Sequence, residues 1–596
     1  METYNNVCED DNGLYLDKYH QVREIHTLKE FLDGGCELYS GNTAFLVKDE
    51  KGGEYREITY DEFKRDVDAL GTKLIDLGLK GKRIAVIGEN CYDWVTAYFA
   101  VANGTGTVVP LDKELSKEEI ERLIKTAECS AVFHTQAYRE IFAESDVDFK
   151  FEMTVYGNSR AGYDGNEIRN LIKSGRNLLE IGDRRFIDAE VMPDSLCSMI
   201  FTSGTTGTPK AVMLSHNNIA SNIMNTGKIF EIKETDRSLS ILPIHHTFES
   251  TIGIMGLLYK GGSIAFFEGL KYLNKNLLEA QCTVLIGVPL IFENLYAKIW
   301  KTAKKEKKDK LLKNAMKVNR TMKTVGLDMH KALFRSVYKP LGGKLRIILS
   351  GAAALDPNVA RGFHDLGFIF SQGYGLTETA PLAAGIPDFE TAKDGYKKVG
   401  SCGPALPQGQ IRIADPNEDG IGEIMYKGPN VMMGYYNMPE ETARVIKDGW
   451  FATGDLGFLD DNGWLYVTGR KKNVIVTKTG KNIYPEEIET YLAEIPYISE
   501  CMVYGTDSED GNDTIVSVQV RPDTDSVEEV LGADPSDEEV YKLIRSAIAD
   551  MNMKIPNWKR VRHIVIRKTE FIKTTTKKIK RQDNIDLLDE DMFTID

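Results

Sequence analysis

Short apolar segments alternate with amphipathic segments along most of the chain. The clearest apolar runs are Ile84–Ile87, Thr107–Val109, Val284–Val288 and Leu345–Leu349. We expect each of them to form a buried strand. Between two of these runs, Ser116–Thr126 has a helical pattern and begins with a capping box, in which a serine and a glutamate satisfy first-turn N–H groups. This alternation predicts an α/β protein with largely parallel sheets.

The pattern changes after about Arg470. Later strands are expected at Cys501–Tyr504, Thr514–Val520 and His563–Ile566, and later helices at Glu486–Ala493 and Glu538–Met551. We therefore predict a large domain over residues 1–470 and a small α+β domain over residues 471–596. The acidic stretch Asp523–Glu539 is expected to be a solvated loop within the small domain.

Composition narrows the class of protein. The chain has 596 residues, a net charge of −15 and 27% charged residues, which is ordinary for a globular protein of several domains. The acidic balance disfavours a nucleic-acid partner, because such proteins are usually basic. The eight cysteines form no CxxC pair, so neither a zinc site nor a dense disulfide framework is expected, and a reducing cytoplasm is the simplest location.

No signal peptide and no membrane-spanning segment are expected. The N-terminus lacks a basic region followed by an apolar core, and no run of about 18 apolar residues occurs. The longest apolar stretch, Thr251–Phe267, is interrupted at Lys260 and predicts a buried helix, a turn and a core strand.

The lysine-rich stretch Lys298–Lys323 has two interpretations. It is either the solvated face of a helix or a peripheral contact with an anionic membrane surface, to which a basic amphipathic helix is suited.

The sequence TSGTTGTPK at Thr202–Lys210 suits a polyphosphate. Its glycines allow tight turns with exposed N–H groups, its hydroxyl side chains add donors, and Lys210 adds a positive charge. It is not a Walker A loop, because Pro209 precedes the lysine and Ala211 follows it.

Thr202–His216 resembles the phosphate-loop signature of the adenylate-forming superfamily, which includes acyl-CoA synthetases, nonribosomal adenylation domains and firefly luciferase. Ala211 stands where the family usually has glycine. The resemblance implies that ATP phosphates bind a set of loop residues, namely Thr202, Ser203, Gly204, Thr205, Thr206 and Lys210.

A second segment, Gln372–Thr379, resembles another signature of that family. An aromatic residue between glycines can offer a flat face to a base, and Glu378 offers a hard oxygen ligand to the Mg²⁺ that accompanies ATP. The resemblance places Thr202 close to the same ion. It assigns nucleotide contacts to Gly373, Tyr374, Gly375 and Thr377, and adenine contacts to Ala352 and Ala353.

Three further positions are assigned around Gly449–Arg470, which resembles the family's ribose-binding stretch. The resemblance makes Asp455 the ligand of both ribose hydroxyls, a role that suits a carboxylate because it is a natural bidentate acceptor for a cis-diol. Arg470 matches the family arginine that also reaches the ribose, and Lys472 matches the hinge about which family members rotate the small domain.

The catalytic lysine is expected at Lys578, in the sequence KTTTKKIKR. The family pattern ends in Gly-Lys, and its lysine reaches the α-phosphate and the attacking carboxylate. A cation is needed there because two anions must approach and charge builds on the phosphoryl oxygens. Lys577 replaces the family glycine, so a shift of register that makes Lys577 the acting residue stays open.

Pro243–Glu249 resembles the acyl-gating segment of the family, with His246 at the gate. The H-x-F-E form is most similar to long-chain fatty acyl-CoA synthetases. The apolar stretches Ile252–Leu258 and Val284–Ile291 either line an acyl tunnel or belong to the core.

The resemblance spans about Glu30 to Asp583. It implies a large domain of two doubly wound subdomains and a distorted β-barrel, followed by a small mobile domain. The implied activity is ATP- and Mg²⁺-dependent activation of a medium- or long-chain fatty acid and its transfer to coenzyme A. Transfer to a carrier protein, a luciferase-like oxygenase and a non-catalytic scaffold are the alternatives.

Overall fold

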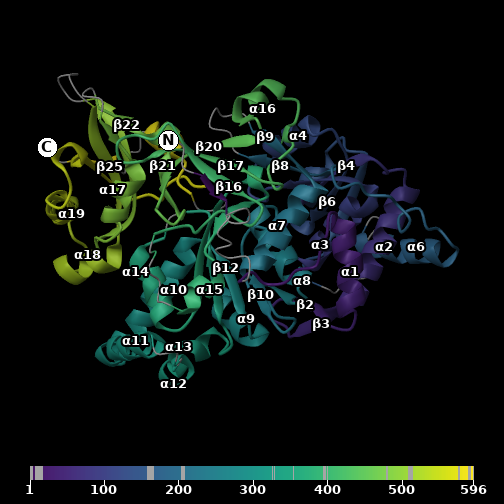
Figure 1. Cartoon of the computed structure of the whole chain (residues 1–596), viewed down its shortest axis with the longest axis horizontal. Coiled ribbons are helices and arrows are strands. Elements are labelled where there is room, and N and C mark those ends of the chain that lie inside the picture. The colour runs from purple at the N-terminus through teal and green to yellow at the C-terminus, as the bar shows by residue number, and fades with distance from the viewer. Residues whose placement is uncertain are drawn as a thin grey trace. The chain divides into compact units, whose positions relative to one another are not determined.

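The computed structural model describes most of the chain and divides into two compact units. The described residues are 4–6, 18–156, 167–202, 209–324, 327, 329–353, 355–393, 398, 400–477, 481–507, 514–574, 578–587 and 592–594. The larger unit comprises Tyr4–Ile411 and Tyr426–Phe451, and the smaller comprises Arg412–Met425 and Ala452–Asp596, together with the first three residues (Figure 1).

A seven-stranded sheet lies at the centre of the first half of the larger unit. Its order is β18-β9-β8-β5-β4-β6-β7, and the pairs from β8 to β7 are parallel whereas β8–β9 and β9–β18 are antiparallel. The strands are β4 (Lys82–Ile87), β5 (Gly106–Leu111), β6 (Cys129–Thr135), β7 (Phe149–Met153), β8 (Leu196–Thr202), β9 (Lys210–Ser215) and β18 (Gly434–Tyr435).

Both faces of this sheet are buried. Along β4, Ile84 and Val86 belong to one hydrophobic cluster and Ala85 and Ile87 to another, as the period-two alternation of a strand requires. The helices of this half include α1 (Leu28–Tyr39), α2 (Tyr60–Asp76), α3 (Tyr92–Ala100), α4 (Lys117–Thr126) and α6 (Ile168–Glu180). The capping box at Ser116 and Glu119 is present as predicted.

An eight-stranded sheet forms the other half of the larger unit, in the order β15-β14-β13-β12-β10-β11-β2-β3. Its strands are β2 (Thr43–Lys48), β3 (Tyr55–Thr59), β10 (Arg237–Ser240), β11 (Ser263–Phe266), β12 (Val284–Gly287), β13 (Ile347–Ser350), β14 (Ile369–Gly375) and β15 (Leu382–Gly385). The central pairs from β14 to β2 are parallel. Its helices include α7 (His216–Ile229), α9 (Leu273–Ala280), α10 (Pro289–Lys305), α11 (Asp309–Thr324) and α14 (Pro357–Asp365). The α/β class predicted from the alternation is confirmed.

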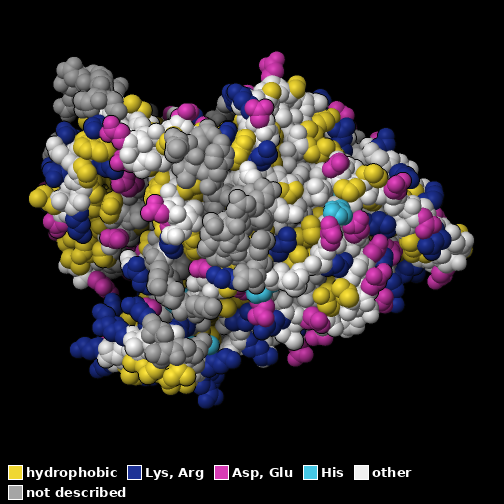
Figure 2. Space-filling model, viewed as in Figure 1, with side chains coloured by type: hydrophobic (Ala, Val, Ile, Leu, Met, Phe, Trp, Pro, Cys, Tyr) yellow, Lys and Arg dark blue, Asp and Glu magenta, His cyan; other side chains and the backbone are white. Residues whose placement is uncertain are grey.

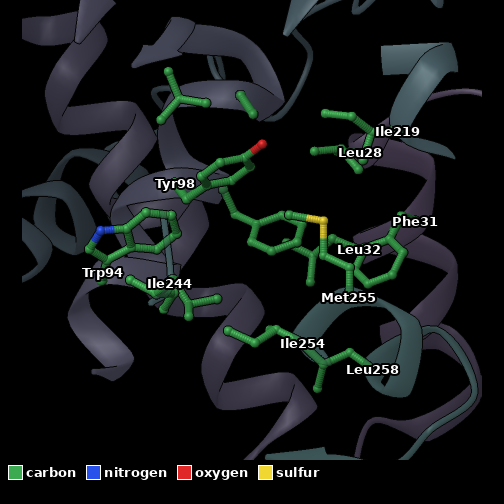
Figure 3. Close-up of a cluster of buried hydrophobic side chains, with 14 of the residues drawn as sticks. Leu28, Phe31, Leu32, Trp94, Tyr98, Ile219, Ile244, Ile254, Met255 and Leu258 are labelled. Atoms are coloured by element: carbon green, nitrogen blue, oxygen red, sulfur yellow. The ribbon is translucent and has the colours of Figure 1, made fainter. Parts of the chain in front are cut away.

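The apolar stretch Thr251–Phe267 is core, as expected. It contributes to the π-helix η3 (Phe248–Met255), α8 (Gly256–Tyr259) and β11. Figure 3 shows Ile254, Met255 and Leu258 packed with the α1 side chains Leu28, Phe31 and Leu32. In the described part of the chain, no helix combines the length and apolarity needed to cross a membrane.

A third sheet has six strands in the order β1-β16-β17-β20-β19, with β21 also paired to β20. Its longer strands are β16 (Gln410–Ala414), β17 (Gly422–Lys427), β20 (Trp450–Leu459) and β21 (Leu465–Arg470). Among the described residues no pairing closes this sheet into a barrel. The described residues therefore form an open sheet where the resemblance implied a distorted barrel.

The C-terminal part of the smaller unit is an α+β arrangement with its own hydrophobic cluster. A four-stranded sheet, β24-β25-β26-β27, has the strands β24 (Ile498–Asp507), β25 (Thr514–Pro522), β26 (Val561–Arg567) and β27 (Met592–Phe593). The helices are α17 (Pro485–Leu492), α18 (Thr524–Leu531), α19 (Asp537–Asn552) and α20 (Arg581–Ile585). The division at Arg470 stays a prediction about domains.

One element of this part was not foreseen. The stretch expected as a solvated loop contains helix α18, whose N-cap Asp523 accepts a hydrogen bond from Ser526 N and whose Val527 is buried. The expectation was wrong because the acidic residues of this stretch occupy the exposed side of a short amphipathic helix.

Candidate functional site

The β8–β9 hairpin places the two ends of the candidate phosphate loop side by side. Thr202 is the last residue of β8 and pairs with Lys210, the first residue of β9. The Thr202 hydroxyl donates to the Lys210 carbonyl oxygen over 3.4 Å. Ser203, Gly204, Thr205 and Thr206, which the sequence also assigns to the phosphates, lie outside the described residues.

The ammonium of Lys210 is held by two groups from the segment around β18. Nζ of Lys210 lies 2.6 Å from Oε2 of Glu441, on α16 (Pro439–Val445), and 5.0 Å from the centroid of the Tyr435 ring. The Lys210 side chain is only 15% exposed. The loop lysine is thus directed by an ion pair and a cation–π contact in a mostly buried position.

The same tyrosine reaches Glu378. The Tyr435 hydroxyl donates to Oε1 of Glu378 over 2.9 Å. Burial raises the pKa of Tyr435 far above its usual value of 10.0, and the adjacent Glu378 charge raises it further. Tyr435 therefore connects the cation of one predicted motif with the carboxylate of the other.

Glu378 is a suitable ligand for nucleotide-bound Mg²⁺. In the part of the chain that the structure describes, no group of three or more His, Cys, Asp or Glu side chains is arranged to hold a metal ion. Mg²⁺ is usually held by one or two carboxylates together with substrate phosphates. One half-buried carboxylate in η6 (Thr377–Thr379) fits that mode.

Close packing explains the glycines of the second motif. A Cβ at Gly373 would lie 2.6 Å from Cδ1 of Leu382, and one at Gly375 would lie 1.9 Å from the carbonyl oxygen of Pro381. Both glycines permit β14 to pair with β15, while Tyr374 between them is buried. Thr377 follows at the first position of η6 and is half-buried.

The candidate adenine contacts follow the neighbouring strand. β13 and β14 are parallel, so Ala352, Ala353 and the second motif lie at the same edge of the sheet, where α/β proteins bind ligands. Ala352 has a φ of 74°, a left-handed conformation that favours glycine. Such strain is typical of ligand-binding positions.

The candidate acyl gate contains a buried acid. The ring of His246 is half-buried and lies 4.2 Å from the ring of His245, whose Nε2 lies 3.5 Å from Oδ2 of Asp112. Glu249 follows His246 by three residues. Burial raises the pKa of Glu249 to about 8, while hydrogen bonds from Ser240 and the Leu242 backbone act to lower it. Glu249 is therefore mostly protonated at neutral pH.

The smaller unit unites three other predicted residues. Asp455 and Arg470 are paired across β20 and β21, and Oδ1 of Asp455 lies 2.7 Å from Nε of Arg470. Desolvation by surrounding atoms lowers the pKa of Lys578 from its usual 10.5, although the residue keeps an exposed surface. The Arg470 charge lowers this pKa further and Asp455 raises it.

Lys578 lies at the end of a short hairpin with a buried anchor. The Lys578 N–H donates to Oγ1 of Thr574 over 3.1 Å, and its carbonyl oxygen accepts from Thr574 N over 2.8 Å. Asn584, which is fully buried, donates to the carbonyl oxygens of Ile572 and Lys580 and accepts from Ile572 N and the buried Arg567. Lys577 lies outside the described residues.

Lys472, the expected hinge, lies in the short 3₁₀ turn η7 (Lys471–Asn473) and is exposed. Desolvation lowers its pKa, as do the charges of Arg470 and Arg581. Its neighbours are held by contacts within the smaller unit: Lys471 pairs with Glu423 over 2.7 Å and Asn473 donates to Glu486 over 2.8 Å.

Sequence reasoning missed Tyr435 and Glu441. Glu441 stands in the run Pro439-Glu440-Glu441, which is ordinary for the first turn of a helix. Nothing in that local sequence separates Glu441 from Glu440, and only the tertiary structure gives it a partner.

Comparisons with known proteins find matches over most of the chain. Residues 35–436 match the family described as AMP-binding enzyme, and residues 472–592 match the AMP-binding enzyme C-terminal domain. Fatty acyl-CoA synthetase A of Dictyostelium discoideum is 29% identical over 565 residues, covering 88% of this chain and 83% of that protein. Long chain acyl-CoA synthetase 5 of Arabidopsis thaliana is 30% identical over 497 residues, covering 78% and 73%.

A solved structure has the same fold. The crystal structure of an anthranilate CoA ligase in complex with anthranoyl-AMP has a TM-score of 0.71 and 18% sequence identity, and the similarity covers 94% of this chain and 96% of that one. At this identity the likeness concerns the fold alone.

Proposed function

The chain belongs to the AMP-binding enzyme family as an adenylate-forming acyl-CoA synthetase, and we propose that its acid substrate is a medium- or long-chain fatty acid. The acid would be activated with ATP as an acyl-AMP and transferred to coenzyme A. Fatty acyl and long-chain names among its relatives support the substrate class, as does the H-x-F-E form of Pro243–Glu249.

The observation that carries the proposed activity is the meeting of Lys210 and Glu378 at Tyr435. A phosphate-binding cation and a carboxylate suited to Mg²⁺ are the two charges that a nucleoside triphosphate requires. Asp455 and Arg470 supply a matching carboxylate and guanidinium for the ribose. Mg²⁺, when bound with ATP, would neutralise part of the phosphate charge.

The proposed mechanism has two steps. In the first, the fatty acid carboxylate attacks the α-phosphorus, the bond to the β-phosphate oxygen breaks and pyrophosphate leaves. Lys578 would stabilise the charge that develops on the phosphoryl oxygens. In the second, the coenzyme A thiol attacks the acyl carbonyl, loses its proton and displaces AMP. We propose that rotation about Lys472 withdraws Lys578 between the steps.

A panel of acids tests the substrate class. The purified protein would be offered acetate, decanoate, palmitate and an aryl acid, each with ATP, Mg²⁺ and coenzyme A, and consumption of the thiol would be followed. The proposal predicts the highest kcat/KM with decanoate or palmitate. A maximum with acetate or the aryl acid would overturn it.

The acceptor is the second point to test. A carrier-protein phosphopantetheine is the alternative thiol, and it would leave thiol consumption absent with coenzyme A while acyl-AMP still forms. Formation of acyl-coenzyme A at a rate comparable to that of pyrophosphate release supports the proposed acceptor.

We further propose a cytoplasmic enzyme that makes peripheral contact with anionic membranes through a basic surface, defined here as Lys298–Lys323 on α10 and α11. It holds ten lysines and one arginine against two acidic residues, in a chain of net charge −15. Leu311 and Val318 on α11 are exposed, as are Leu327 and Met329 beyond it. Lysine and arginine side chains gather over this part of the molecule in Figure 2.

Exposed apolar side chains among lysines favour a lipid surface, because they can enter the interface while the lysines meet anionic headgroups. Sedimentation with vesicles tests this contact. Wild-type protein should bind phosphatidylglycerol-containing vesicles and not pure phosphatidylcholine vesicles, and binding should weaken with salt. The triple variant K310Q/K313Q/K317Q should lose at least about tenfold in affinity.

The matched control changes three exposed lysines elsewhere in the same unit, K80Q/K82Q/K125Q. It should bind the vesicles like wild type. Equal loss in both triple variants, or no binding of wild type, would leave Lys298–Lys323 as a solvated helix face.

A further inference from the structure

The candidate phosphate-binding lysine already has an anionic partner. Oε2 of Glu441 lies 2.6 Å from Nζ of Lys210, within the range of a charge-assisted hydrogen bond. Because the Lys210 side chain is 15% exposed, few directions remain from which its ammonium can meet another anion. An incoming phosphate oxygen and the Glu441 carboxylate therefore compete for the same cation.

We infer that Glu441 is a positioning residue that holds Lys210 in the place of a phosphate oxygen, releases it when ATP binds and recovers it as pyrophosphate leaves. This inference rests on the proposed function, because it requires Lys210 to bind the β- and γ-phosphates. No bond is made or broken in the exchange: one carboxylate contact is replaced by one phosphate contact.

Glu441 has a second partner that makes its release feasible. The same oxygen, Oε2, lies 2.6 Å from Nη2 of Arg444, one helical turn further along α16. The Arg444 side chain is 65% exposed and can follow the carboxylate toward solvent. Glu441 thus keeps a counter-charge after Lys210 turns to the nucleotide.

The backbone around this exchange is fixed. Oγ1 of Thr442 accepts from Tyr435 N over 2.9 Å and donates to the Met438 carbonyl oxygen over 2.9 Å. These bonds tie α16 to β18, so the exchange needs only side-chain rotation at Glu441. Lys210 meanwhile stays over the Tyr435 ring, which keeps it near Glu378.

Nucleotide binding to the full-length chain tests the inference without any acid substrate. The variant E441Q should bind ATP about two- to fivefold more tightly than wild type, since a partly exposed ion pair no longer has to be broken. It should bind AMP unchanged, because AMP has no β- or γ-phosphate. E440Q is the matched control: Glu440 is exposed in the same turn, and its change should alter neither affinity.

Replacing Arg444 should have the opposite effect on the affinity for ATP. In R444Q, Glu441 loses one of its two cationic partners and keeps Lys210. Because Glu441 then has no other of these cations to turn to when Lys210 leaves it, ATP should bind more weakly by a similar factor. The double variant E441Q/R444Q should bind ATP like E441Q, because Arg444 acts only through Glu441. This cycle separates exchange from a direct contact between Arg444 and phosphate.

Three results overturn the inference: an E441Q affinity for ATP equal to or weaker than wild type, an equal gain for AMP, or a double variant that binds as weakly as R444Q. Failure of the proposed function is distinguishable, because a different acid substrate or thiol acceptor would change the result of the acid panel and leave these nucleotide affinities as predicted. Product inhibition by pyrophosphate should be stronger in E441Q than in E440Q, by about the same two- to fivefold.

Discussion

Tyr435 contacts two charged side chains, Lys210 and Glu378, in different ways. Its ring face lies under the Lys210 ammonium at 5.0 Å, and its hydroxyl donates to Glu378 over 2.9 Å. Because burial and Glu378 both raise its pKa, it is a neutral donor at neutral pH. Tyr435 therefore fixes how these two charges, which we propose bind the nucleotide, lie relative to each other.

Lys578 carries the first prediction at the residue scale. K578A should lower the rate of acyl-AMP formation by about 10²- to 10³-fold, because charge on the phosphoryl oxygens loses its donor. Since its pKa is lowered, the wild-type rate should fall on the alkaline side at a pH below the usual lysine value of 10.5. K578R should lack this alkaline limb, because arginine stays charged.

K577A tests the register of this assignment. It should keep nearly the wild-type rate of acyl-AMP formation. If K577A is inactive and K578A is active, the alternative register is correct and Lys578 is a neighbouring surface lysine.

Glu249 carries a prediction on stability. Its pKa is raised from 4.5 to about 8 in the folded protein, so the folded state holds the proton more tightly than the unfolded state. The stabilisation is complete below pH 4.5 and is lost as the pH rises through about 8. Between these limits wild-type protein should lose up to about 1.4 kcal/mol per pH unit from this group.

E249Q removes this titration because an amide does not ionise. The thermal midpoint of E249Q should depend less on pH between 5 and 8 than that of wild type. The midpoint of E249Q should therefore rise relative to that of wild type as the pH approaches 8. The exposed-residue variant E440Q should follow wild type. Parallel curves for wild type and E249Q would contradict the shifted pKa.

At the scale of elements, the period of apolar positions predicted several of the strands and helices that the structure contains. Strands foreseen at Ile84–Ile87 and Val284–Val288 appear as β4 and β12, and Glu538–Met551 appears within α19, because apolar runs and helical periods are local signals. α18 was missed because acidic residues dominate its sequence. The closure of a sheet depends on distant pairings, so the open six-stranded sheet was not foreseen.

The buried anchor of the Lys578 hairpin gives a prediction at this scale. N584A removes four hydrogen bonds that hold Ile572, Lys580 and the buried Arg567. Acyl-AMP formation should fall about 10- to 100-fold, because small displacements of a catalytic group are costly. Thioester formation from supplied acyl-AMP should change far less, since Lys578 is not needed in that step.

Q582A is the control for this element. Gln582 lies on the same helix, is exposed and donates to Asp586, so its loss should leave both steps near wild type. An equal fall of both steps in N584A would mean general destabilisation instead of a misplaced lysine.

At the scale of the whole molecule, the predicted site residues fall into two groups, one in each compact unit. Lys210, Glu378 and the β14 motif belong to the larger unit, and Asp455, Arg470 and Lys578 belong to the smaller. Sequence motifs predicted these positions because each has its own local signature. They could not identify Tyr435 or Glu441, whose contacts depend on tertiary packing between β9, β18 and α16.

The most direct test of the account is pyrophosphate released per enzyme with ATP, Mg²⁺ and the preferred fatty acid, with and without coenzyme A, for wild type and K578A. Wild type should release about one equivalent without coenzyme A and turn over continuously with it, and K578A should release pyrophosphate about 10²- to 10³-fold more slowly in both conditions. An undiminished release by K578A, or a wild-type turnover that ignores coenzyme A, would contradict the account.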